Sequence, residues 1–134
     1  MNPVKKALII VAVLMGLASA ISTVTTVFAA DKGTLLEGTL VDSKCYLMDN
    51  KNIGNDHGGM KGCGTICLKG GNPAALVTKD KKFYALIVAA PVLASYVGQT
   101  LRVHGTLYGT ALNLDKAEVL KDGKWVAIDI GPMM

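Results

Sequence analysis

Four side chains that could bind a soft metal ion or act as nucleophiles gather in one short stretch of the chain. They are Cys45, His57, Cys63 and Cys67, which lie within 23 residues of one another. Thiolate and imidazole are donors that zinc and copper favour, and three cysteines with one histidine make up a complete tetrahedral zinc set. Cys63 and Cys67 are four residues apart, so they would point the same way from a helical turn. This spacing predicts a site for zinc or copper formed by the four residues.

The segment around these residues, 43–72, is rich in glycine and lacks a long apolar period. Seven glycines lie between positions 54 and 71. The pattern predicts an irregular Cys/His loop with one short helical turn around 63–68. Glycine lets a backbone wrap a small centre without Cβ clashes, and a bound metal would stabilise such a loop. Met48 and Met60 lie in the same loop, and thioether donors would favour copper(I).

The same cysteines allow a structural interpretation. An odd number of cysteines in an oxidising compartment requires an explanation. Cys45 could form a disulfide with Cys63 or Cys67, closing a loop of about 20 residues that would stabilise the fold by roughly 3 kcal/mol. Small exported domains often need such a link. The chain would then be a structural or interaction domain of a periplasmic or membrane-associated complex, with one thiol left over.

A thiol redox protein is the third interpretation. Catalytic cysteine pairs favour two intervening residues at the start of a helix, whereas three separate Cys63 from Cys67. No catalytic residue is identified, and a non-enzymatic binding module is favoured.

Two further polar residues have structural or supporting interpretations. Asp42, three residues before Cys45, either orients a metal ligand or a thiol by contacting it, or caps a turn. His104 lies in an alternating segment and is predicted to be a half-buried strand histidine.

The first 29 residues predict export. Lys5 and Lys6 precede an apolar run over 7–17, the layout of a secretory signal peptide. Small residues before Asp31 favour cleavage after Ala29. An uncleaved anchor is the alternative, since about 20 apolar residues suffice to span a bilayer. Either outcome places the rest of the chain in the periplasm or another extracytoplasmic space, and membrane association is expected only if the leader is not cleaved.

The remainder of the chain, residues 30–134, is long enough for one small domain, and its charge is nearly balanced. It carries 12 Lys and Arg against 10 Asp and Glu, and the two signs alternate along the chain. A nucleic-acid-binding domain would show a basic stripe, so no nucleic-acid partner is expected. A protein partner is compatible with this surface, and its identity is left open.

Outside the Cys/His loop, short alternating segments predict a β-rich fold. Gly105 inside one of them predicts a bulge or sharp bend, and Asp122-Gly123 predicts a hairpin turn. Proline at 91 and glycine at 98 bracket a predicted short helix. The predicted strands are 34–42, 73–78, 82–88, 100–108, 111–120 and 125–130. Close turn spacing favours a mainly all-β fold, a small antiparallel β-barrel of the oligonucleotide/oligosaccharide-binding (OB) type with one short helix. A two-sheet sandwich is the alternative.

The polar motif also resembles that of a group of small exported bacterial proteins with an OB-like barrel and no assigned activity. The shared positions begin at Gly38-x3-Asp42-x2-Cys45, continue through His57 and Cys63-x3-Cys67, and end with Gly71-x-Pro73 and Leu93-x4-Gly98-x6-Gly105. They cover nearly all of the chain after the leader. The resemblance implies export and a β-barrel, and it implies no reaction.

Overall fold

The computed structural model describes residues 30–132. The predicted leader, residues 1–29, lies outside the described residues. Six strands form the framework: β1 (Asp31–Asp42), β2 (Ala74–Val77), β3 (Phe83–Ile87), β4 (Thr100–Tyr108), β5 (Ala111–Lys121) and β6 (Lys124–Ile128). Three short helices accompany them: α2 (Ser43–Met48), α3 (Cys63–Lys69) and the 3-10 helix η1 (Ala90–Tyr96).

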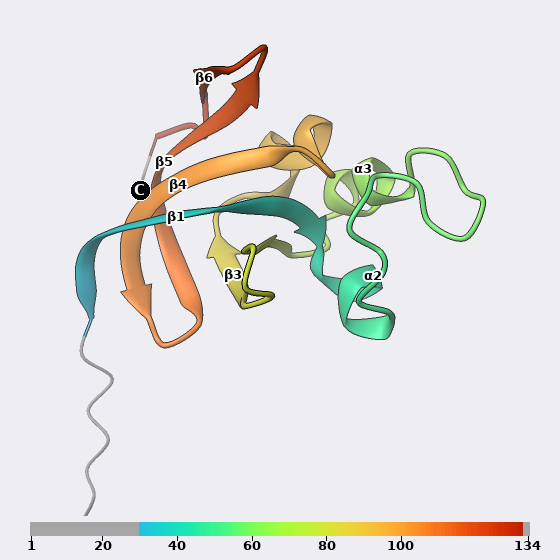
Figure 1. Cartoon of the computed structure of the whole chain (residues 1–134), viewed down its shortest axis with the longest axis horizontal. Coiled ribbons are helices and arrows are strands. Elements are labelled where there is room, and N and C mark those ends of the chain that lie inside the picture. The colour runs from blue at the N-terminus through green and yellow to red at the C-terminus, as the bar shows by residue number, and fades with distance from the viewer. Residues whose placement is uncertain (1–29, 133–134) are drawn as a thin grey trace, which may run out of the picture.

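The strands close into a barrel. Their order is β3-β2-β1-β4-β5-β6, and β3 also pairs with β5, so five strands form a ring to which β6 adds by pairing with β5. The β3–β5 pair is parallel, while all other strand pairs are antiparallel. A parallel pair needs a long crossover, which η1 and β4 supply here. The predicted mainly antiparallel OB-like barrel is confirmed, and the two-sheet sandwich is not formed (Figure 1).

Closure depends on a long β1 and a bent β4. The first part of β1 pairs with β4, and its last four residues pair with β2. In β4 the register with β5 shifts between His104 and Gly105. A Cβ at Gly105 would overlap the Asn113 carbonyl of β5, so only glycine lets the two strands approach so closely there. The bend predicted at Gly105 is confirmed.

The core fills the barrel and extends beneath one end of it. Leucines on several strands are fully buried, and Leu68 of α3 and Leu93 of η1 belong to the same apolar cluster. Burying a leucine stabilises a fold by roughly 1.5–3 kcal/mol. The Cys/His loop is therefore joined to the barrel core through Leu68.

The helices differ in number from the sequence prediction. The helix predicted over 91–98 corresponds to η1, and the helical turn predicted at 63–68 is α3. The prediction of a single regular helix missed α2, which Asp42 caps from the end of β1. An aspartate directly before a helix satisfies free N–H groups of its first turn. Such a cap was visible in the sequence, but α2 has only six residues and no apolar period.

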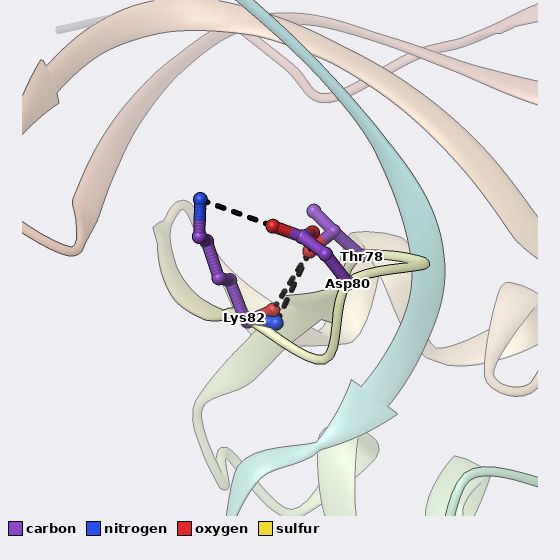
Figure 2. A network of polar contacts seen from close by, with 3 residues as sticks. All are labelled: Thr78, Asp80 and Lys82. Carbon is purple, nitrogen blue, oxygen red and sulfur yellow. Dashed lines mark hydrogen bonds and ion pairs between the residues drawn. The ribbon is translucent and has the colours of Figure 1, made fainter.

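The tight turn between β2 and β3 is held by side chains. The Thr78 hydroxyl interacts with the Asp80 carboxylate, accepts a hydrogen bond from the Lys82 N–H at 3.2 Å, and lies near the Lys82 carbonyl (Figure 2). Lys82 Nζ also lies 3.0 Å from Asp80 Oδ2. These groups are exposed, so the ion pair contributes little free energy. Its effect is local: it fixes the turn that stands beside β1.

Candidate functional site

The candidate residues all belong to the connection between β1 and β2. Asp42 ends β1, Cys45 lies on α2, and His57 follows in a loop. Cys63 begins α3, and Cys67 follows one turn later. Figure 1 shows α2 and α3 together at the end of the barrel where β1 stops. The site is therefore built on one end of the barrel.

Asp42 is the last residue of β1 and the N-cap of α2, and these two roles fix its position. Its Oδ1 accepts a hydrogen bond from the Lys44 N–H at 3.1 Å. The side chain is completely buried, and its Oδ2 has no hydrogen-bond partner in the described part of the chain. The interpretation of Asp42 as a cap is confirmed, and one of its carboxylate oxygens also lies within 4.8 Å of donor atoms of Cys45 and His57.

His57 is held by a small hairpin. Its backbone N–H and C=O exchange hydrogen bonds with Met60, at 3.1 and 2.8 Å. Gly58 and Gly59 form the turn between them with positive φ angles of 55° and 85°, which glycine adopts without strain. The two glycines therefore reverse the chain and return it toward α3.

Within the described residues, one ring nitrogen of His57 is hydrogen-bonded and the other is not. Nε2 lies 2.8 Å from the Gly54 carbonyl oxygen. A carbonyl can only accept, so Nε2 donates its proton and Nδ1 retains a lone pair in the neutral ring. Nδ1 is buried and has no hydrogen-bond partner within residues 30–132. This tautomer leaves Nδ1 available to a ligand.

Several contacts fix α3 on η1. The Thr65 hydroxyl donates to the Ala94 carbonyl at 2.9 Å, and the Asn55 side chain accepts from the Thr65 N–H at 2.8 Å. Gly64 packs where a Cβ would overlap Val97. With Leu68 buried in the core, these contacts turn Cys63 and Cys67 toward α2.

The donor atoms form two groups of three that share Cys45. The Sγ atoms of Cys45, Cys63 and Cys67 all lie within 4.8 Å of one another, and we call them the three-cysteine triplet. One donor atom each of Asp42, Cys45 and His57 also lie within 4.8 Å of one another, and we call these the mixed triplet. All three cysteines are free thiols and half-buried. The structure thus brings the three predicted cysteines together, and it places His57 with Cys45 and Asp42 rather than with Cys63 and Cys67.

The Asp42 carboxylate raises the pKa values of two of the thiols, Cys45 and Cys67. It is the largest cause that raises the pKa of Cys45 to about 12, followed by burial and the neighbouring cysteines. The pKa of Cys67 is raised mainly by burial, with Asp42 as the next cause. A negative charge beside a thiol disfavours the thiolate. The raised pKa values of Cys45 and Cys67 therefore keep these two thiols protonated near neutral pH until a cation compensates the charge.

Other residues considered from the sequence lie outside this cluster. Met48 and Met60 are 77% and 58% exposed, so their side chains belong to the surface of the loop. His104 lies on β4 with its Nε2 3.8 Å from Glu118 Oε2, and its side chain is 40% exposed. Its prediction as a half-buried strand histidine is confirmed.

Comparisons with protein-family models, with curated proteins and with solved structures find no match to this chain. Within residues 30–132, no helix has the length and apolar character needed to cross a membrane. The convergence of Cys45, Cys63 and Cys67 is compatible with a metal site, and this geometry is the basis on which function is considered.

Proposed function

We propose that this protein is an exported, non-enzymatic binding module that holds a zinc or copper ion through Cys45, His57, Cys63 and Cys67. One observation carries the proposal: three thiols from two separate helices lie within 4.8 Å of one another. Sulfur and imidazole donors suit both metals. His57 adds a ring nitrogen within 4.8 Å of the Cys45 sulfur, and its Nδ1 is buried without a hydrogen-bond partner in the described chain.

The environment of the thiols supports metal binding over thiol redox chemistry. Reactive cysteines have lowered pKa values in electropositive surroundings. Here Asp42 and burial raise the pKa values of Cys45 and Cys67 instead. A metal ion overcomes this effect because it replaces the thiol protons directly.

The two histidines of the chain provide a matched test. Metal content would be measured by native mass spectrometry of protein purified without chelator or reductant. The His57→Ala variant is expected to bind less metal and to lose part of the stabilisation that metal gives, which raises Tm and amounts to about 2.7 kcal/mol at a free metal concentration 100 times Kd. His104→Ala, with its side chain on the outside of β4, is the control and should behave like the wild type. Unchanged metal content and melting in His57→Ala would contradict the proposed ligand set.

Thiol labelling distinguishes the alternative function. Denatured protein should show three labelled thiols after its metal has been removed. Protein without metal and with a single labelled thiol would instead support a domain linked by one disulfide. The Cys45 sulfur lies within 4.8 Å of those of Cys63 and Cys67, so either could be its partner. That result would direct attention to protein partners.

Export is the part of the proposal that the first 29 residues support. Two lysines before an uncharged apolar segment are the pattern of a secretory signal. N-terminal sequencing of the protein from the extracytoplasmic fraction is expected to begin at Ala30. Full-length protein confined to the cytoplasm would refute export, and full-length protein in the membrane fraction would support the anchor alternative.

A further inference from the structure

Two residues of the mixed triplet each carry a buried polar atom that has no hydrogen-bond partner in the described chain. These are Asp42 Oδ2 and His57 Nδ1, on side chains that are 0% and 8% exposed. None of the ion pairs formed within residues 30–132 includes Asp42. Burying a carboxylate oxygen without a partner is costly, and proteins ordinarily pair such a group or place it on a metal.

Both atoms require the same kind of partner. A carboxylate oxygen and an imidazole lone pair are acceptors, so they cannot satisfy each other. A cation between them would satisfy both at once. Cys45 belongs to this triplet and could add a thiolate. Oxygen, nitrogen and sulfur together form a donor set for a divalent ion such as zinc, whereas copper(I) prefers soft sulfur donors.

The charges of the whole cluster point to more than one ion. Three thiolates and the Asp42 carboxylate carry four negative charges, and His57 is neutral when Nδ1 binds a metal. One divalent ion would leave two negative charges uncompensated in a site of half-buried thiols and a fully buried carboxylate, and one copper(I) would leave three. Two divalent ions balance the charge completely. Two ions therefore leave less uncompensated charge beside the buried Asp42 carboxylate than one ion does.

The geometry offers a separate position for each ion. The donors form two triplets that share Cys45, and His57 and Asp42 are not part of the three-cysteine triplet. Donor atoms of a tetrahedral zinc site lie about 3.3–3.8 Å apart, so each triplet can close on an ion by shifts on the order of 1 Å. Each position then has three protein donors and one place left for water or another ligand.

We propose that the site holds two divalent ions of the zinc class, one in the three-cysteine triplet and one in the mixed triplet, with the Cys45 thiolate bridging them. This inference rests on the proposed metal-binding function and deepens it. It assigns Asp42 as a metal ligand. It also identifies the metal class as divalent rather than copper(I).

Zinc stoichiometry tests the inference. Metal-free full chain would be titrated with zinc chloride and examined by native mass spectrometry and calorimetry. The wild type is expected to bind two zinc ions, and Asp42→Asn to bind one. Asp115→Asn, which removes an exposed carboxylate from β5, is the control and should still bind two. Asparagine can still accept the Lys44 N–H hydrogen bond, so the cap of α2 is retained.

Each outcome has a separate meaning. One zinc ion in the wild type, or two in Asp42→Asn, would overturn the two-ion site and leave the proposed metal binding intact. No zinc in the wild type would refute both. Should Asp42→Asn fail to fold, the wild type loaded with cobalt(II) tests the bridged two-ion site instead. Two thiolate-bridged cobalt ions show magnetic coupling in electron paramagnetic resonance, and an uncoupled spectrum at full loading would overturn the bridge.

Discussion

At the scale of the residue, Asp42 has the greatest influence on the site. It is the only fully buried carboxylate in the described chain, and it both caps α2 and faces the thiols. A single side chain therefore couples the local helix start to the acidity of Cys45 and Cys67. The effect of Asp42 on thiolate formation depends on whether a cation is present. Without a cation the carboxylate disfavours the thiolates, and a bound cation compensates both negative charges.

This coupling predicts faster thiol alkylation in metal-free Asp42→Asn. Asp42 is the largest cause that raises the pKa of Cys45 to about 12, so neutralising it should lower that pKa. More thiolate would then be present at about pH 9, and the thiolate is the reactive form. The rate of iodoacetamide modification at Cys45 can be followed by peptide mass spectrometry across a pH series.

Asp115→Asn is the control for that experiment and should leave the rate unchanged. In the wild type, the rate at Cys45 should still be rising well above pH 9, since the thiol titrates at about 12. A plateau in the wild type near pH 9, or equal rates in the wild type and Asp42→Asn, would contradict the role given to Asp42.

At the scale of the element, α3 connects the site to the barrel. One face of this seven-residue helix presents Cys63 and Cys67, and Leu68 is completely buried in the core. A helix this short has little intrinsic stability, so its tertiary contacts hold it in place. The positions of the thiols therefore depend on packing at a residue that is not a donor.

Leu68→Ala is expected to lower the free energy of unfolding by about 2–5 kcal/mol, because it leaves a cavity beneath α3. It should also weaken zinc binding, since α3 loses the contact that orients its thiols. Urea unfolding and zinc titration would measure the two effects. Ile66→Ala on the exposed side of α3 is the matched control, as Ile66 is 60% exposed, and should change stability by no more than about 0.5 kcal/mol. Equal effects of the two substitutions would contradict this role of Leu68.

At the scale of the whole molecule, the outer face of the barrel carries its own polar network. Arg102 Nε donates to Glu118 Oε2 at 2.9 Å across β4 and β5, and the guanidinium lies 4.4 Å from the Trp125 ring. Arg102 is the first cause that lowers the pKa of Glu118, and His104 contributes further. This network links β4, β5 and β6, so it ties the extra strand to the closed barrel.

The lowered pKa of Glu118 predicts how stability changes with pH. A carboxyl whose pKa is lower in the folded state stabilises the fold above its unfolded pKa, near 4.3 in model peptides, and this stabilisation is lost as pH falls through the folded value. Glu118→Gln should therefore lose less Tm than the wild type when pH is lowered from about 7 to about 3. Glu37→Gln is the control, because Glu37 forms no ion pair within residues 30–132. Parallel Tm profiles for the wild type and Glu118→Gln would refute the contribution of this pair.

The sequence by itself determined the strand positions and the composition of the donor set. Alternation of apolar residues reflects which side of a strand is buried, and this local property located five of the six strands within about two residues. The first strand begins three residues earlier than predicted, and Gly105 marked the bend correctly. Cysteine and histidine types likewise indicated the proposed metals, zinc or copper, since donor chemistry belongs to each side chain.

Only the tertiary structure decided how the donors are grouped. The spacing from Cys45 to Cys67 is compatible with a disulfide or with a single four-ligand site, because flexible glycine-rich segments allow many closures. Contacts far apart in sequence fix the position of α3 and its two cysteines: Leu68 lies in the core and Thr65 donates to Ala94. The parallel β3–β5 pair that closes the barrel is equally non-local. Such contacts depend on the packing of whole elements, which no local pattern specifies.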